Sequence, residues 1–138
     1  MSAPRRFIDS NVFVYVLSAD PNYSRRALAI LEDAEEGRFE AYTSTLVISQ
    51  VLAHLERRKR REAMEKFLVY LEDSPIFVAE TRLDDFLEAR ALAARSGLPL
   101  HRMWDDLVIA AQMSRLGIRE IYSNDSDFDR IPGIRRIF

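Results

Sequence analysis

Four aspartates occupy positions where their carboxylates could act together. Asp9 follows one short apolar segment, Asp125 and Asp127 follow another, and Asp106 lies near the start of a predicted helix. Carboxylates crowded at one place repel each other unless a hard cation such as Mg²⁺ or Mn²⁺ neutralises them. A cation held in this way can activate water, bind a phosphate and stabilise a leaving oxygen. The chemistry that needs this arrangement is hydrolysis of a phosphodiester bond.

Each acid alone also has an ordinary structural interpretation. Asp9 could cap a helix, and Asp106 could interact favourably with a helix dipole. The acids within residues 125–129 could be turn residues or the start of a calcium-binding loop. Arg130 stands where that loop requires glycine, so the calcium-loop interpretation fails.

Short apolar segments alternate with stretches of helical periodicity along the chain. Strands are predicted at residues 6–8, 39–42, 75–79 and 118–122, with a further short strand at 134–138. Helical spacing is present over residues 24–36, after Thr43 and Ser44, from about 62 to 72, over 83–95 and over 103–116, and Asp9, Ser44 and Thr81 are candidate caps. This alternation predicts an α/β fold with a central parallel sheet of four to five short strands flanked by helices. In such a sheet, ligands bind beyond the carboxyl ends of the strands, which is where three of the four acids are predicted to lie.

Composition narrows the class of protein further. The 138 residues suit a single domain over 1–138, and the absence of cysteine excludes a disulfide framework and thiolate chemistry. Only His54 and His101 could offer imidazole, and no apolar stretch is long enough to cross a bilayer. We therefore expect a soluble, cytoplasmic protein. Its formal charge of −2 means that any nucleic acid must bind through local basic patches.

Four segments occur in an order that resembles the PIN-domain ribonucleases from end to end: FIDSNVFVYVL, TSTLVISQVLAHL, WDDLVIAAQMSRLG and IYSNDSDFDRIPGI. The resemblance implies a single PIN-like domain with Mg²⁺- or Mn²⁺-dependent endoribonuclease activity, of the kind found as the toxin of a toxin–antitoxin pair. It implies that the catalytic and metal-binding acids are Asp9, Asp106, Asp125 and Asp127, with Asn11 and Ser123 as small polar residues that support them.

Gln50 departs from the family pattern, which usually has glutamate at this place. A neutral amide holds a hard cation less firmly, so we expect one metal site on Asp9, Asp106 and Asp125 and a weakened second site. Glu56 points elsewhere on the helix, and the imidazole of His54 is a poor magnesium ligand. We expect Gln50→Glu to tighten metal binding and raise activity.

The presence of Gln50 in place of the usual glutamate also supports an alternative function, a PIN-fold RNA-binding or regulatory module with weak or no catalysis. A nuclease of RNA processing rather than a toxin is a further alternative. A receiver-type domain is set aside because Lys59 and Lys66 lie in a helical region and not near the acids. On a regular helix Asp105 points about 100° away from Asp106, which predicts a supporting or capping role.

Two surfaces are candidates for binding partners. The basic run at residues 57–61 could track RNA phosphates, through Arg57, Arg58, Arg60 and Arg61, or be a solvated helix end. His101 and Arg102 are further candidate substrate contacts. The helix with the sequence REAMEKFLVYLED has a broad apolar face, which indicates either deeper burial or a partner surface. The resemblance favours a homodimer and an antitoxin segment as partners.

Overall fold

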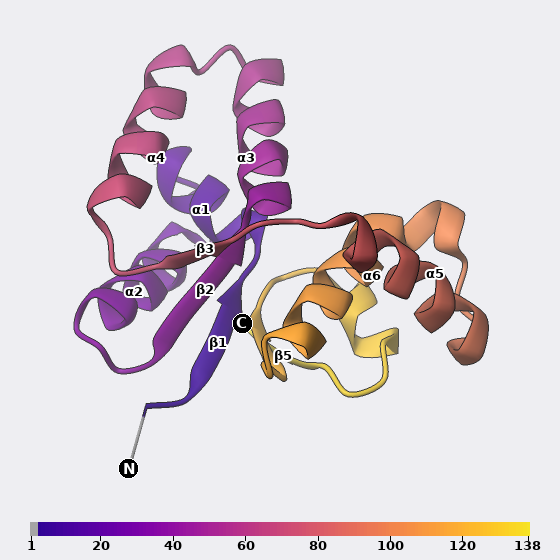
Figure 1. The fold of residues 1–138 in the computed structure, drawn as a ribbon. Helices are drawn as coiled ribbons and strands as arrows, with labels where there is room; N and C mark the ends of the chain where they lie inside the picture. Colours follow the sequence, from indigo (N-terminus) through magenta and orange to yellow (C-terminus); the bar gives the residue numbers. More distant parts are fainter. Residues whose placement is uncertain (1–2) are drawn as a thin grey trace.

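The computed structural model describes residues 3–138, which form a parallel sheet with helices on both faces (Figure 1). The strands lie in the order β3-β2-β1-β4-β5, and each neighbouring pair is parallel. Their bounds are Arg5–Ile8 for β1, Glu40–Ser44 for β2, Phe77–Ala79 for β3, Glu120–Tyr122 for β4 and Arg135–Ile137 for β5. The predicted sheet is confirmed, and the segment near the C-terminus is its fifth strand.

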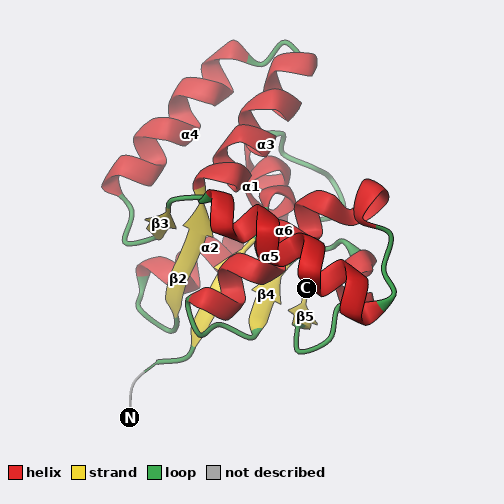
Figure 2. Ribbon diagram, turned by 45° about the vertical axis from the view of Figure 1, so that its right-hand side comes forward, coloured by secondary structure: helices red, strands yellow, loops and turns green. Residues whose placement is uncertain are grey.

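Helices cover both faces of this sheet. They are α1 (Ser10–Leu17), α2 (Ser24–Glu35), α3 (Thr45–Arg57), α4 (Arg61–Asp73), α5 (Leu83–Ser96), α6 (Leu100–Arg115) and a short 3-10 helix, η1 (Ser126–Arg130). Figure 2 shows α5 and α6 in front of β4 and β5, with α2 behind the sheet. In Figure 1, α3 and α4 form a hairpin that extends past the carboxyl ends of the strands. Within residues 3–138, no helix is both long and apolar enough to cross a membrane.

The central strand β1 sets the position of the candidate site. It pairs with β2 on one side and with β4 on the other, so successive strands are added on one side of β1 and then on its other side. Phe7 and Ile8 are completely buried, as expected for a strand covered on both faces. The register pairs Ile8 with Tyr122, so the residues that follow them emerge side by side. Such a switch point is where open α/β sheets bind their ligands.

Local hydrogen bonds explain where the helices begin. Asp9 caps α1 through the amide of Ser10, and Ser44 caps α3, as predicted. The predicted cap at Thr81 is wrong. The Thr81 hydroxyl contacts other elements, while the backbone amide of Arg82 donates to the side chain of Asp85, 2.9 Å away within the first turn of α5.

The start of α6 also differs from the prediction. The helix begins at Leu100, after Pro99, and not at Met103. Met103 has non-helical φ and ψ values of −121° and 18°, so a kink separates the first turn from the rest of the helix. Asp105 and Asp106 therefore lie in the first turn after this kink.

Candidate metal centre

Asp9 is fixed at the carboxyl end of β1 by hydrogen bonds to both of its carboxylate oxygens. The amide of Ser10 donates to Oδ1 at 2.8 Å, and the hydroxyl of Ser123 donates to Oδ2 at 2.6 Å. The backbone amide of Asp9 donates to the carbonyl of Tyr122, which continues the pairing of β1 with β4. Only 4% of the residue is exposed. The sheet therefore places this carboxylate with little freedom to move.

Ser123 connects Asp9 with the loop that follows β4. Its hydroxyl oxygen accepts from the amide of Asp125 at 3.0 Å and from Nδ2 of Asn11 at 3.2 Å. Asn11 Oδ1 in turn accepts from the amide of Asn124. These contacts hold the ends of β1 and β4 together around the acids.

Three further carboxylates converge at this edge of the sheet. One oxygen each from Asp106, Asp125 and Asp127 can be chosen so that all three lie within 4.8 Å of one another. Asp125 caps η1, and its Oδ1 accepts from the amide of Asp127 at 2.9 Å. Asp106 reaches the same place from α6, with only 7% of the residue exposed. Helix α6 and the segment that follows β4 thus contribute to one cluster.

Burial and mutual repulsion make negative charge costly in this cluster. Burial, followed by the charges of Asp125, Asp105 and Asp9, together raise the pKa of Asp106 to about 9. Burial also raises the pKa of Asp9 to about 6, although its hydrogen bonds from Ser123 and Ser10 oppose the shift. Both acids therefore take up protons readily when no cation balances them.

Within residues 3–138, the charges of this cluster are not paired with basic side chains. No salt bridge involves Asp9, Asp106, Asp125 or Asp127, and Arg136 acts on Asp125 only as a nearby charge while it pairs with Asp129. The donor set consists of carboxylate oxygens, which are the ligands that Mg²⁺ and Mn²⁺ prefer. The residues present thus fit a hard divalent cation.

Gln50 and Asp105 meet beside the cluster. Nε2 of Gln50, on α3, donates to Oδ2 of Asp105, on α6, at 3.1 Å. The other amide atom, Oε1, is buried and has no hydrogen-bond donor among residues 3–138. The charge of Asp105 contributes to the raised pKa of both Asp9 and Asp106. The supporting or capping role predicted for Asp105 agrees with these contacts, but its hydrogen bond with Gln50 was not predicted.

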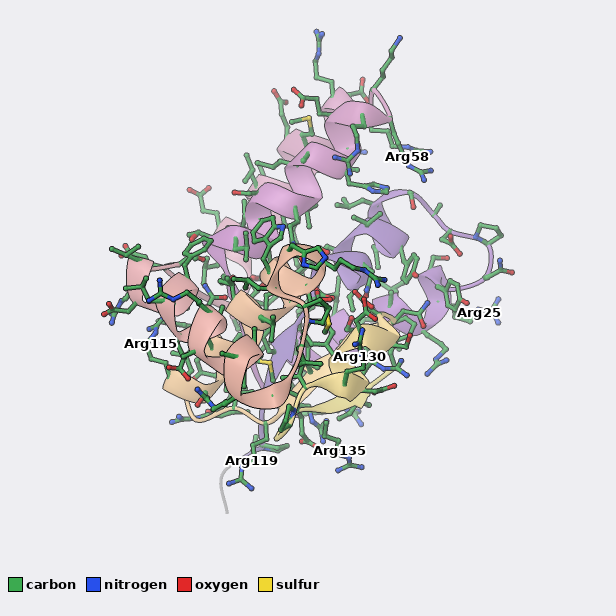
Figure 3. The ribbon with its side chains drawn as sticks, turned by 90° about the vertical axis from the view of Figure 1, so that its right-hand side faces the viewer. Arg25, Arg58, Arg115, Arg119, Arg130 and Arg135 are labelled. Atoms are coloured by element: carbon green, nitrogen blue, oxygen red, sulfur yellow. The ribbon has the colours of Figure 1, made fainter. Side chains whose placement is uncertain are left out.

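The remaining predicted contact residues lie on the surface. Arg57, Arg58, Arg60 and Arg61 are all exposed at the junction of α3 and α4, and His101 and Arg102 are exposed in the turn before the kink in α6. In Figure 3, Arg58 lies at the far end of the α3–α4 hairpin, whereas Arg119 and Arg135 lie at the opposite end of the molecule. The basic run is thus on the side of the sheet that carries the acids.

The broad apolar face of α4 is divided between core and surface. Phe67 and Leu71 are buried, and the Phe67 ring packs on Phe13 of α1 with centroids 5.2 Å apart. Leu68 and Val69 are exposed by 46% and 57%. A groove of about 260 Å³ separates α4 from α1 and α2. It is lined mainly by apolar side chains, namely Phe13, Val16, Leu17, Leu28, Leu31, Phe67 and Tyr70, with Glu32, Glu35 and Lys66 beside them.

Comparisons with known proteins agree on one family. The family model for the PIN domain matches residues 6–134. Ribonuclease VapC13 of Mycobacterium tuberculosis is 26% identical over 137 residues, which cover 94% of this chain and 97% of that protein. A VapC ribonuclease of Mycobacterium bovis matches to the same extent.

Solved structures show the same fold. Mycobacterium tuberculosis VapC20, described as a toxin that cleaves the sarcin–ricin loop, aligns with a TM-score of 0.73 at 19% identity, over 90% of this chain and 92% of that one. DNA-bound VapBC of Salmonella typhimurium aligns with a TM-score of 0.64 at 21% identity, over 97% of each chain.

Proposed function

The chain belongs to the PIN domain family, and from this we propose that it is a Mg²⁺- or Mn²⁺-dependent endoribonuclease that hydrolyses RNA phosphodiester bonds. The observation that carries the proposal is the convergence of Asp106, Asp125 and Asp127 within 4.8 Å, beside the buried Asp9. Relatives named as VapC ribonucleases support the choice of RNA as substrate.

The residues of this chain would divide the work between holding the cation and orienting its ligands. Asp106, Asp125 and Asp127 would hold the cation, together with Asp9. Ser123 and Asn11 would keep Asp9 in place through the hydrogen bonds described above. When bound, a divalent cation supplies Lewis-acid stabilisation of the negative charge that develops on the phosphate. Asp106 would release the proton that burial and repulsion otherwise favour on it.

The test is cleavage of a mixed RNA pool by the purified protein with Mg²⁺, with Mn²⁺ or with EDTA. The Asp106→Asn variant removes one cluster charge, and Asp73→Asn is the matched control, because Asp73 is exposed at the end of α4. We expect cleavage that requires the metal, is lost in Asp106→Asn and persists in Asp73→Asn. A wild-type protein that binds Mn²⁺ and RNA but cleaves nothing would instead support the RNA-binding or regulatory alternative.

We further propose that the chain is the toxin of a toxin–antitoxin pair. Similar structures include VapBC from Salmonella typhimurium and a toxin–antitoxin complex from Klebsiella pneumoniae. The apolar groove between α1, α2 and α4 would accept an apolar segment of the antitoxin. Induced expression should arrest growth, and Asp106→Asn should abolish the arrest. Leu28, on the groove and 47% exposed, gives a second test, since Leu28→Glu should prevent neutralisation by the antitoxin while arrest persists.

A homodimer is the third part of this proposal. Leu83 and Leu87 lie one turn apart on α5 and are exposed by 73% and 42%, which leaves an apolar stripe on the surface. Light scattering after size exclusion should give a dimer for the wild type and a monomer for Leu83→Glu/Leu87→Glu. A wild-type monomer would contradict the dimer without affecting the proposed chemistry.

A further inference from the structure

Gln50 and Asp105 form a polar pair that joins α3 to α6 next to the cluster. Nε2 of Gln50 donates to Oδ2 of Asp105 at 3.1 Å, and the amide of Asp106 donates to Oδ1 of Asp105 at 3.0 Å. Each oxygen of Asp105 therefore has its own donor. One donor comes from α3 and the other from the backbone of α6, so the carboxylate is held in one orientation.

This pair contributes one formal negative charge next to the acids. The amide of Gln50 is neutral, and the charge of Asp105 acts on both Asp9 and Asp106. Residues that orient the ligands of a metal and add charge around it change its affinity without touching it. Asp105 carries such a charge and is held in place by the amide of Gln50. It also accepts from the backbone amide of the cluster acid Asp106, which follows it in the chain.

We propose that Asp105 is a positioning residue of the metal centre, and that Gln50 and Asp105 act as one unit that supplies a single oriented negative charge. The inference rests on the proposed metal-dependent function. In this arrangement the acid lies on α6, at Asp105, instead of on α3, at position 50, and the Gln50 amide is its hydrogen-bond partner. Glutamine at position 50 therefore does not by itself indicate a degraded site.

If the pair acts as a unit, its two groups should be exchangeable. In the double variant Gln50→Glu/Asp105→Asn, the amide at position 105 can donate to the carboxylate at position 50, and its carbonyl can still accept from the amide of Asp106. The net charge is unchanged. The second carboxylate oxygen at position 50 would take the place of the buried Oε1 atom, which has no donor among residues 3–138.

The experiment measures Mn²⁺ binding by calorimetry on metal-stripped protein. We expect Asp105→Asn to weaken Mn²⁺ binding by about 10- to 100-fold, as is typical when a residue that supports metal ligands is removed. The double variant should recover most of the lost affinity. Asp73→Asn should bind as the wild type does, and Asp106→Asn should lose binding. Thermal denaturation in EDTA checks that each variant is folded. If Asp105→Asn does not fold, Gln50→Ala replaces it, because this change removes the side-chain donor and keeps the charge of Asp105.

The outcomes separate this inference from the proposed function. Wild-type affinity in Asp105→Asn, with binding lost in Asp106→Asn, would overturn the role of Asp105 and leave the metal centre standing. A loss that the double variant does not recover would overturn the exchangeable unit and make Asp105 a ligand in its own right. A wild-type protein that does not bind Mn²⁺ would overturn both.

Discussion

The hydroxyl of Ser123 lies 2.6 Å from Oδ2 of Asp9, and through this contact the carboxyl ends of β1 and β4 share one buried hydrogen bond. The same hydroxyl oxygen accepts from the amide of Asp125. A single small side chain thus couples the acid that follows β1 to an acid that follows β4. Because it is completely buried, water cannot easily replace it.

Ser123→Ala should weaken metal binding without unfolding the protein. The substitution leaves Oδ2 of Asp9 with only the long, 3.5 Å contact from Asn11. The hydrogen bond from Ser123 lowers the pKa of Asp9, so its loss should raise that pKa above its present value of about 6. Mn²⁺ affinity should fall by about 10- to 100-fold, and carboxyl NMR should show the shifted titration. Ser49→Ala, on the exposed face of α3, is the control. Unchanged titration of Asp9 would show that Ser123 has no such role.

The metal-free protein should lose stability as pH rises. The pKa values of Asp9 and Asp106 are raised in the folded state to about 6 and about 9, from an ordinary value of 3.8. The folded state therefore binds more protons than the unfolded state above the ordinary pKa. Its stability is greatest below that value and falls until the pH passes the folded-state pKa.

Thermal denaturation in EDTA checks this dependence between about pH 5 and about pH 8. Asp106→Asn should flatten it and should raise the Tm at the higher pH by about 4 °C, the shift that about 1 kcal/mol gives in a domain of this size. Mn²⁺ should restore the stability of the wild type at the higher pH but not that of the variant. A Tm of the wild type that does not change with pH in EDTA would contradict the raised pKa values.

Sequence reasoning predicted the fold well because the strong signals are local and periodic. The apolar segment ending at Ile8 and the acid after it indicate a buried parallel strand with a cap, and both are present. The positions of Asp9 and Asp125 follow from the fact that parallel strands end at one edge of the sheet. The resemblance added Asp106, which sequence spacing alone places only near that edge.

What could not be predicted depends on contacts between distant elements. The kink at Met103 separates the first turn of α6 from the turn that carries Asp105 and Asp106, and the sequence does not indicate it, since methionine is an ordinary helix residue. The contact between Gln50 and Asp105 joins residues 55 positions apart. Threonine is a common helix cap, but the hydroxyl of Thr81 accepts a hydrogen bond from Nε2 of Gln112 at 2.6 Å instead of capping α5. In each case tertiary packing overrides the local preference.

Among the basic residues that form ion pairs within residues 3–138, Arg115 should contribute most to the stability of the fold. Its Nε and Nη2 atoms donate to the two oxygens of Asp85 at 2.9 and 3.0 Å, and the Asp85 side chain is 2% exposed. Arg115→Ala would leave that buried charge without its ion-pair partner, with the Arg82 amide still donating to it, at a cost of about 3 kcal/mol. Urea denaturation should show this loss. Arg95→Ala, which breaks the exposed pair with Glu88, should cost no more than about 1 kcal/mol. Equal losses in the two variants would contradict the importance of burial.

The end of α3 should contribute to RNA binding through the positive charges of its arginine side chains. Gln50, His54 and Arg57 are spaced so that they share one face of the helix, which leads from the cluster toward the basic run. Burial lowers the pKa of His54, and the charges of Arg58 and Arg57 lower it further, so both guanidinium groups lie near this face. A strand of RNA with one phosphate at the acids could therefore place another against these arginines.

Arg57→Ala/Arg58→Ala, in the Asp106→Asn background to prevent cleavage, should weaken the binding of single-stranded RNA at low salt. Loss of two phosphate contacts should also make the slope of log K against log salt shallower by about 1.4, since each contact on a single strand contributes about 0.7. Fluorescence anisotropy over a series of salt concentrations measures both effects. Arg119→Ala/Arg135→Ala removes the same charge from the opposite end of the molecule and should leave the slope unchanged. If both double variants weakened binding equally, only net charge would matter, and the α3 surface would have no specific role.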